Sequence, residues 1–389
     1  MRILHVSDAY LPKQGGIEIQ VSDLARRQAE AGHDVAVLTC APDVTGRRRR
    51  TGVGVPEREA PAPGGAVPEL RVGIPWWAIP AANEQVYAVL RRDRPDVVHA
   101  HLSVLSPLSI LVVRAAARER VPVVMTLHSL WWLATPLYAI AHVLLRWGRW
   151  PVAWTAVSDL AARPLRRIVG RHGEVTLLPN GVEPADWRVS PVVRDAREVV
   201  AVSVMRLEPR KRPLALLRML RQARRELPEG VRLRLVVIGE GPLQGRMERI
   251  LRKHGLEADV ELPGRLDRTG IRELYRRADV YVAPATLESF GIAALEARCA
   301  GLPVLARART GIADFVTSDV DGLLSPSDRR MAADLARVAG DAALRERLTL
   351  HNRSVRPPAG WGEVLQRCDL AYKAAAELSP AQRQPARRR

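Results

Sequence analysis

Short hydrophobic runs rich in β-branched residues alternate with longer amphipathic stretches along most of the chain. This alternation is the pattern of parallel sheets covered by helices. In the first half it predicts six strands, Arg2–Val6, Asp34–Thr39, Val97–Ala100, Val121–Leu127, Thr155–Val157 and Val175–Leu178. Helical spacing of apolar residues between the first two strands predicts a helix over Ile17–Ala31, which ends at Gly32 as a C-cap.

The same alternation restarts after a polar, proline-containing segment, Glu183–Arg197. Helices are predicted over Pro213–Glu226, Leu243–His254 and Trp361–Leu378, with a further helical stretch from Met331. Five more strands are predicted at Val199–Val204, Leu233–Ile238, Val260–Leu262, Asp279–Ala283 and Pro303–Ala306.

The predicted fold class is therefore α/β, with two tandem Rossmann-like, doubly wound domains. The expected boundaries are 1–182 for the N-terminal domain, 183–197 for a linker and 198–355 for the C-terminal domain. A terminal helix over 356–378 is expected to pack back towards the N-terminal domain, and 379–389 is expected to be a disordered basic tail. Segment Thr45–Pro68 lacks periodicity and is expected to be a loop. Because such sheets bind ligands outside the carboxyl ends of their strands, we expect a cleft between facing domains to be the site.

Composition changes this picture only in part. A chain of 389 residues favours two domains. An excess of Lys and Arg over Asp and Glu, 60 against 42, gives a formal net charge of +18, which suits a phosphate-bearing substrate or an anionic membrane. The three cysteines have neither disulfide nor zinc spacing. With no signal peptide and no apolar run of spanning length, a cytoplasmic location is expected.

The densest chemical signal is Ala283–Pro303, APATLESFGIAALEARCAGLP. A predicted strand ends here, and a loop leads into a helix whose first turn follows Ser289-Phe290-Gly291. The free N–H groups of that turn can receive a phosphate, and Gly291 permits close approach. Glu288 precedes the helix and Glu296 lies one to two turns inside it, so both can address a ligand there. An ordinary helix start, with Glu288 as a cap, is the alternative.

This segment, Glu288-x7-Glu296 within ESFGIxxLEAxxxGLPV, resembles the signature of the family 4 retaining glycosyltransferases, and the resemblance extends from Arg2 to about Tyr372. It implies a GT-B fold and a nucleotide-sugar donor. Glu288 would contact the donor sugar, and Glu296 would bind the ribose hydroxyls. Backbone amides near Ser289, Phe290 and Gly291 would hold the sugar or the phosphates.

Other motifs resemble the same family in the same order. In VSVMRLEPRKRP, Arg206 and Lys211 would grip the donor diphosphate, since two cations at a strand end stabilise the charge of a leaving group. IGEGP, which contains Gly239, resembles the nucleotide-side turn, and LPNGVE resembles the end of the first domain.

The N-terminal domain offers a second set of candidates. The adjacent Gly15 and Gly16, after Gln14, allow a backbone to approach phosphate or sugar at a helix start. His128, after a predicted strand, resembles the family's histidine near the donor sugar, although a structural role is open. His99 is expected to pack in the core and His101 to face the cleft.

Two segments depart from the resemblance. Thr310–Asp314 replaces a turn that is richer in glycine in many relatives, which puts the local donor contact in doubt. Residues 130–154 contain five tryptophans and two arginines, which predicts either a helix at an anionic membrane surface or one packed on the N-terminal domain.

The resulting hypothesis is a retaining hexosyltransferase that uses a UDP- or GDP-sugar as co-substrate and needs neither cofactor nor metal. Its acceptor would be a hydroxyl of a lipid, a polysaccharide or a natural product. Asp319-Val320-Asp321 is a D-x-D sequence, but it lies in a late loop. The alternatives are an NAD(P)-dependent oxidoreductase, a nucleic-acid-binding protein, and an epimerase or phosphorylase on the same fold. The first lacks a correctly spaced G-x-G-x-x-G, and the second lacks any recognisable binding motif, so no nucleic-acid partner is expected.

Overall fold

The computed structural model describes residues 1–12, 15–41, 67–72, 82–130, 146–192, 195 and 197–379. The chain forms two compact units. Unit 1 comprises Met1–Gly181 together with Trp361–Arg389, and unit 2 comprises Val182–Gly360. The segment expected as a linker, 183–197, thus belongs to unit 2, where Trp187 is buried and its ring packs 5.9 Å from that of Tyr275.

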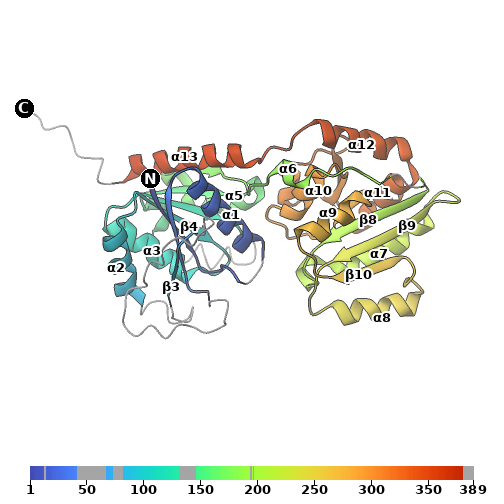
Figure 1. The fold of residues 1–389 in the computed structure, drawn as a ribbon, viewed down its shortest axis with the longest axis horizontal. Coiled ribbons are helices and arrows are strands. Elements are labelled where there is room, and N and C mark those ends of the chain that lie inside the picture. Colours follow the sequence, from blue (N-terminus) through green and yellow to red (C-terminus); the bar gives the residue numbers. More distant parts are fainter. Residues whose placement is uncertain are drawn as a thin grey trace, which may run out of the picture. The chain divides into compact units, whose positions relative to one another are not determined.

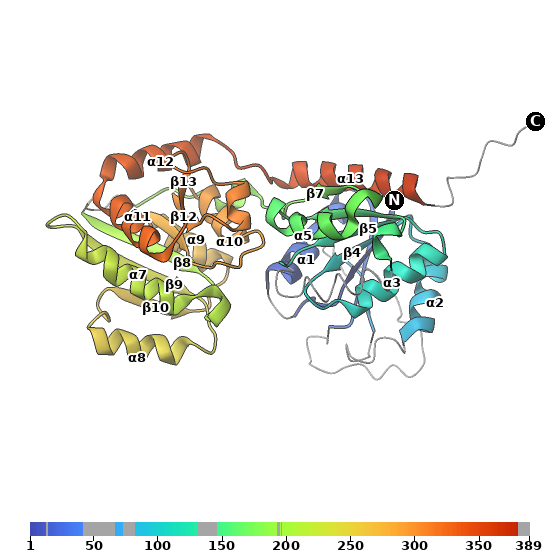
Figure 2. The same ribbon diagram turned by 180° about the vertical axis from the view of Figure 1, so that it is seen from behind.

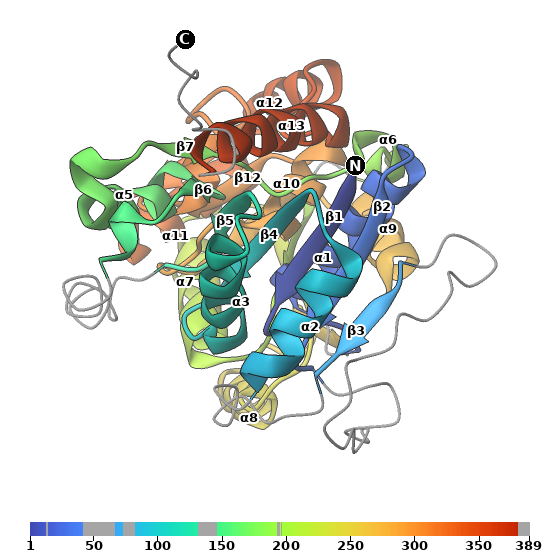
Figure 3. The same cartoon turned by 90° about the vertical axis from the view of Figure 1, so that its left-hand side faces the viewer.

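Unit 1 contains a seven-stranded parallel sheet in the order β3-β2-β1-β4-β5-β6-β7 (Figure 3). Its strands are β1 (Arg2–Ser7), β2 (Asp34–Thr39), β3 (Glu69–Arg71), β4 (Val97–Leu102), β5 (Val123–Leu127), β6 (Val152–Ala156) and β7 (Val175–Leu177). Its helices are α1 (Gly16–Glu30), α2 (Asn83–Asp93), α3 (Pro107–Arg118), α5 (Asp159–Val169) and α13 (Trp361–Leu378).

Helices α1 and α13, from opposite ends of the chain, pack against the sheet of unit 1 (Figure 1). Apolar residues of α1, such as Val21 and Leu24, share one core cluster with Val364 and Tyr372 of α13 and with Val124 of β5. α13 also contacts β4 and β6. The last helix is therefore an integral part of unit 1, because its apolar residues pack into the same core as those of α1 and the sheet.

Unit 2 contains a six-stranded parallel sheet in the order β10-β9-β8-β11-β12-β13. Its strands are β8 (Glu198–Val204), β9 (Arg232–Ile238), β10 (Val260–Gly264), β11 (Val280–Ala283), β12 (Val304–Arg307) and β13 (Gly322–Ser325). Its helices are α6 (Pro184–Trp187), α7 (Pro213–Arg225), α8 (Gln244–His254), α9 (Arg268–Arg276), α10 (Ile292–Cys299), α11 (Asp328–Gly340) and α12 (Ala342–Ser354). α7 and α11 lie side by side over the sheet (Figure 2).

Of the tryptophan-rich segment 130–154, the structure describes residue 130 and residues 146–154. Trp147–Arg149 is a short 3-10 helix, and Trp154 lies in β6. Trp147 and Trp154 are both buried to 2% exposure, so they belong to the core of unit 1 and are not free to enter lipid. Trp131 and Trp132 lie outside the described residues, as do most of the loop expected over Thr45–Pro68 and the tail from residue 380. Among the described helices, none combines the length and the apolarity that a membrane crossing requires.

Candidate active site

The predicted site residues of unit 2 gather at the carboxyl edge of its sheet. The strand order reverses between β8 and β11, and such a switch point is where open α/β sheets bind ligands. Arg206 and Lys211 follow β8, whereas the segment Glu288–Gly291 follows β11. Because β8 and β11 are neighbours, residues far apart in sequence meet at this edge.

Lys211 and Glu288 form a direct ion pair, with Nζ and Oε2 separated by 2.5 Å. The two side chains are only 22% and 17% exposed, so the pair is partly shielded from water. A cation and an anion held together in this way give a site that can bind both a phosphate and a sugar hydroxyl. The structure thus brings together two residues that the sequence predicted separately.

Arg206 lies on the same loop but is more accessible. Its guanidinium is 3.7 Å from the carboxylate of Glu208, and its side chain is 42% exposed. Arg212, which follows Lys211, makes two hydrogen bonds to Asp328 and one to the carbonyl of Pro284, so its guanidinium is already occupied. The bond to Pro284 ties the loop after β8 to the loop after β11, and the bonds to Asp328 tie it to the start of α11. The residue next to Lys211 is therefore anchored on two sides.

The Ser289–Gly291 loop is packed against the turn Gly311–Asp314. The Gly311 amide donates to the carbonyl of Glu288 at 2.9 Å, and a Cβ on Gly311 would lie 2.0 Å from the carbonyl oxygen of Ser289. Gly291 has a φ of +93° and precedes α10 as its N-cap. Phe290 is buried, and its ring lies 5.4 Å from that of Phe315. The segment Thr310–Asp314, whose role the sequence left in doubt, therefore packs against the Ser289–Gly291 loop and supports its conformation.

Glu296 is half-buried on α10. Burial raises the pKa of Tyr281 well above its usual range, and the charges of Glu288 and Glu296 add to this rise. Both carboxylates thus lie near the same buried phenol, whose hydroxyl donates to the carbonyl of Val204 at 3.2 Å. Both glutamates therefore act electrostatically on one buried residue of β11.

Gly239 has a structural reason to be glycine. Its φ is +132°, and a Cβ there would lie 1.9 Å from the carbonyl oxygen of Met205. The β9 turn therefore presses directly on the backbone next to Arg206, and the Leu207 amide donates to the Glu240 carbonyl at 2.9 Å. Gly239 positions the Arg206 loop, whatever else it contacts.

In unit 1, the predicted residues lie at the carboxyl edge on either side of the switch point between β1 and β4. Gly15 is the N-cap of α1 with an extended backbone, and Gly16 is exposed in the first turn. The preceding Gln14 lies outside the described residues. His128 follows β5 and is 6% exposed.

His128 belongs to a buried histidine cluster that the sequence analysis did not assemble. His5, His99 and His101 are fully or almost fully buried, and His5 faces His99 in register across β1 and β4. His101 Nδ1 lies 3.0 Å from His128 Nε2, and His101 Nε2 lies 3.0 Å from His5 Nδ1. His99 is thus a core residue as expected, whereas His101 is buried and does not face an open cleft. The alternation of histidines at positions 99 and 101 of one strand was the signal available for this cluster.

Burial also governs the titration of this cluster. It lowers the pKa of His5 and of His128 to about 4, and it lowers the pKa of His99 and His101 well below the usual range. Near His128, the side chain of Asn180 opposes the shift. All four imidazoles are therefore neutral at pH 7.

Two further polar groups near this edge were not predicted. Asp8, just after β1, accepts hydrogen bonds from the amides of Leu108 and Ser109 and so caps α3. Asn180, in the LPNGVE motif, is 7% exposed, and its Oδ1 has no hydrogen-bond partner among the described residues. A buried polar atom without a partner is uncommon and marks a place where a ligand atom can bind.

The D-x-D sequence is used for structure. Asp321 is buried in an ion pair with Arg298 at 3.0 Å, and Asp319 pairs with Arg337 at 2.9 Å. Both carboxylates are thus neutralised by arginines, which argues against a metal role for them.

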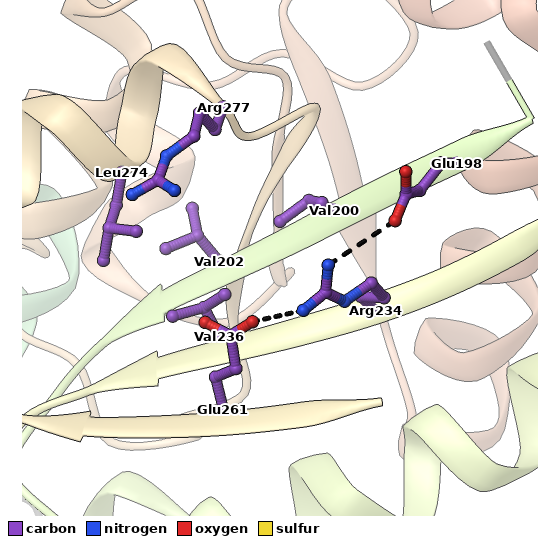
Figure 4. Close-up of a pocket in the computed structure, with 8 residues that line it drawn as sticks. All are labelled: Glu198, Val200, Val202, Arg234, Val236, Glu261, Leu274 and Arg277. Atoms are coloured by element: carbon purple, nitrogen blue, oxygen red, sulfur yellow. Dashed lines mark hydrogen bonds and ion pairs between the residues drawn. The ribbon is translucent and has the colours of Figure 1, made fainter. Parts of the chain in front are cut away.

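A small pocket in unit 2 lies away from the predicted residues (Figure 4). It is lined by β8, β9, β10 and α9, and Arg234 spans it between Glu198 and Glu261. Its volume of about 110 Å³ is well below the several hundred cubic ångströms that ligand sites usually offer. It is not a candidate for a nucleotide site.

Comparison with known proteins identifies the class of this site. Residues 14–186 match the family model "Glycosyltransferase Family 4", and residues 190–354 match "Glycosyl transferases group 1". The D-inositol 3-phosphate glycosyltransferase of Kribbella flavida is 30% identical over 414 residues, which cover 95% of this chain and 92% of that protein. The phosphatidyl-myo-inositol mannosyltransferase of Mycolicibacterium smegmatis is 30% identical over 355 residues, which cover 89% of this chain and 86% of that protein.

The fold agrees with this class. The crystal structure of Anabaena HepE in complex with UDP and glucose superimposes with a TM-score of 0.72 at 18% identity, covering 96% of this chain and all of that one. The protein is a glycosyltransferase with two Rossmann-like units of the GT-B fold. It belongs to glycosyltransferase family 4. This assignment disfavours the oxidoreductase and nucleic-acid-binding alternatives.

Proposed function

We propose that the protein transfers a hexosyl group from a UDP- or GDP-sugar to a hydroxyl acceptor with retention of configuration and without a metal. The observation that supports this most is the Lys211–Glu288 pair at the switch point of unit 2, beside the Ser289–Gly291 loop. Anabaena HepE, which shares the fold, was crystallised with UDP and glucose.

In the proposed complex, unit 2 holds the nucleotide diphosphate. Arg206 and Lys211 neutralise its phosphates, and the first-turn amides of α10 after Gly291 donate to phosphate or sugar oxygens. Glu296 accepts hydrogen bonds from the ribose hydroxyls, and Glu288 accepts one from the sugar. Unit 1 supplies the acceptor side, and its Gly15, Gly16 and His128 contact the phosphate or the sugar of the donor.

In the proposed reaction, the bond between the anomeric carbon and the phosphate oxygen breaks first. Charge builds on the departing diphosphate, where Arg206 and Lys211 stabilise it more strongly than in the ground state. The acceptor oxygen bonds to the same face of the sugar, and its proton passes to the phosphate oxygen that has just left. The products are the glycoside and a nucleoside diphosphate, so no enzymic nucleophile, cofactor or metal takes part.

Nucleoside diphosphate release from a panel of UDP- and GDP-sugars tests the transfer. The names of the relatives make inositol phosphate and phosphatidylinositol the first acceptors to include. The proposal expects a product whose anomeric configuration, measured by NMR, equals that of the donor, with a rate unchanged by EDTA. An inverted product, or activity abolished by EDTA and restored by a divalent cation, would refute the mechanism.

We further propose a cytoplasmic location and contact of the 130–154 segment with an anionic membrane, a contact to which the buried Trp147 and Trp154 do not contribute. Co-sedimentation with anionic and with neutral vesicles tests the contact, and absence from the anionic pellet would eliminate it.

A further inference from the structure

A continuous chain of hydrogen bonds runs through unit 1 from Gln28 in the last turn of α1 to His128, just after β5. Gln28 Oε1 lies 2.7 Å from His5 Nε2, and the chain continues from His5 Nδ1 to His101 Nε2 and from His101 Nδ1 to His128 Nε2, each at 3.0 Å. All four side chains are at most 6% exposed. At the far end, His128 Nδ1 has no hydrogen-bond partner among the described residues.

The hydrogen bonds between the three imidazoles must all be donated in the same direction. A neutral imidazole has one N–H donor and one lone-pair acceptor, so each ring that accepts at one nitrogen must donate from the other. If Gln28 Oε1 accepts from His5 Nε2, then His5 Nδ1 accepts from His101 Nε2, and His101 Nδ1 accepts from His128 Nε2. His128 is then protonated at Nε2 and leaves a free lone pair at Nδ1.

Exchanging the oxygen and nitrogen of the Gln28 amide would exchange donor and acceptor in every one of these bonds. A second branch of hydrogen bonds, which starts at the other end of this amide, decides between the two directions. The other end of Gln28 lies 2.8 Å from the Tyr372 hydroxyl, which lies 3.0 Å from His99 Nδ1. His99 Nε2 lies 2.7 Å from Thr126 Oγ1, which lies 2.6 Å from Thr155 Oγ1.

Only one direction of donation gives every group of this branch its hydrogen bond, and Thr155 at its end decides which. Its hydroxyl donates to the Met125 carbonyl at 3.2 Å, so it accepts from Thr126, and Thr126 accepts from His99 Nε2. His99 Nδ1 then accepts from Tyr372, whose oxygen accepts from the Gln28 amide nitrogen. In the reversed network Thr155 would donate to Thr126 and lose its bond to Met125, which costs one buried hydrogen bond.

A metal site is the competing interpretation, because ligand nitrogens of His5, His99 and His101 lie within 4.8 Å of one another. However, all six ring nitrogens of these residues already have hydrogen-bond partners. A metal would have to break these bonds, and a spread of several ångströms is wide for a tetrahedral shell whose bonds are about 2 Å long. The network explains the cluster without an ion.

We propose that Gln28, His5 and His101 are positioning residues, which act together with the Tyr372–Thr155 branch to hold His128 as the Nε2–H tautomer with Nδ1 as a hydrogen-bond acceptor. The side chain of Asn180 interacts with the His128 ring and favours its protonated form, and Asn180 Oδ1 has no other partner among the described residues, so it is a second acceptor at this place. The His128 end of this hydrogen-bond network therefore matches a ligand that donates from hydroxyl groups, such as a sugar. This last step rests on the proposed glycosyl transfer, whereas the tautomer itself does not.

The ¹⁵N spectrum of the imidazoles tests the tautomer directly. Protein labelled with ¹⁵N at histidine, in a deuterated background, gives a long-range ¹H–¹⁵N pattern that differs between Nε2–H and Nδ1–H rings. The spectrum of His128→Gln identifies the signals of His128 by their absence. We expect the Nε2–H pattern for His128 in the wild-type chain at pH 7.5. An Nδ1–H pattern, with its proton directed towards Asn180, would overturn the proposal.

Gln28→Met tests whether the far end of the chain sets this tautomer. Methionine has a similar volume but offers His5 no comparable acceptor, so the polarity is no longer fixed and His128 should gain Nδ1–H character. Gln366→Met, on the exposed face of α13 in the same unit, is the matched control and should leave the pattern unchanged. If circular dichroism shows that Gln28→Met is unfolded, Tyr372→Phe replaces it, because it removes the partner that orients the Gln28 amide. An unchanged His128 pattern in the folded variant would refute the role of Gln28.

Kinetics then test the functional step. If His128 accepts from a sugar hydroxyl, Gln28→Met should lower kcat/KM for the donor by about threefold to tenfold, the effect of one neutral hydrogen bond, and Gln366→Met should not. Normal kcat/KM in Gln28→Met with a changed tautomer would refute the link to the sugar. If no sugar nucleotide is turned over by the wild type, the proposed function fails while the spectra still decide the tautomer.

Discussion

Gly311→Ala should impair the candidate site by displacing the Ser289–Gly291 loop, here called the donor loop, against which the turn at Gly311 packs. An alanine Cβ would lie 2.0 Å from the Ser289 carbonyl oxygen and 2.9 Å from the Phe290 Cα, both of them backbone atoms. Because real Cβ contacts are essentially never shorter than 3.0 Å, the turn and the loop must separate by about 1 Å. The shift also strains the bond from the Gly311 amide to the Glu288 carbonyl.

The magnitude follows from these two effects. Overpacking of this kind costs about 1–3 kcal/mol and a weakened hydrogen bond about 1 kcal/mol, so the free energy of unfolding should fall by about 2–4 kcal/mol. A displacement of about 1 Å in the loop should lower kcat/KM about 100-fold.

Urea denaturation and donor kinetics measure the two quantities, with Gly245→Ala as the matched control. Gly245 lies in α8 of the same unit, and a Cβ there would meet no atom within 4 Å, so this variant should be as stable as the wild type or slightly more so. If Gly311→Ala keeps wild-type stability and kcat/KM, the proposed packing of the turn against the donor loop is wrong.

Two further predictions concern charge. In a double-mutant cycle, Lys211→Met and Glu288→Gln should each weaken binding of the nucleotide-sugar, measured by calorimetry. The coupling energy should be about 1 kcal/mol, because their ion pair is only partly buried, and strictly additive effects would mean that the pair is not formed in solution. Stability should also fall on acidification. Folding lowers the pKa of His5 and His128 from 6.5 to about 4, so the unfolded chain binds protons first, and stability present above pH 6.5 should be lost as the pH falls towards 4. Each ring contributes about 3 kcal/mol, and a free energy of unfolding that stays constant between pH 7 and 5 would contradict the buried neutral cluster.

Most of the fold could be predicted from the sequence because parallel strands buried on both faces leave strong apolar runs. The helix Trp361–Leu378 was predicted at its observed bounds. Glu69–Arg71 and Gly322–Ser325 were missed as strands, since their sequences, ELR and GLLS, contain no β-branched residue that would indicate a strand. Trp147 and Trp154 were misleading, because a tryptophan beside an arginine looks the same in a core and at a membrane.

Those residues of the candidate site that belong to one continuous sequence motif could be predicted. Those that only the arrangement of the strands brings together could not. The loop after β11 forms a local motif, so Glu288, Gly291 and Glu296 were identified together. The cluster around His128 depends on strand order and register, which place His5 of β1 beside His101 of β4 although 96 residues separate them. Side-chain burial and the partner of each ring nitrogen follow from packing that the sequence alone does not specify.

The most direct measurement is a calorimetric titration of the full chain with UDP, GDP, UDP-glucose, UDP-N-acetylglucosamine and GDP-mannose. The variants are Lys211→Met and Glu296→Ala, with Lys253→Met on the exposed face of α8 as the matched control. We expect one nucleotide base to bind selectively, with affinity lowered about tenfold or more in both site variants and unchanged in the control. Failure of every nucleotide to bind, or equal binding by wild type and site variants, would contradict a donor site between β8 and β11.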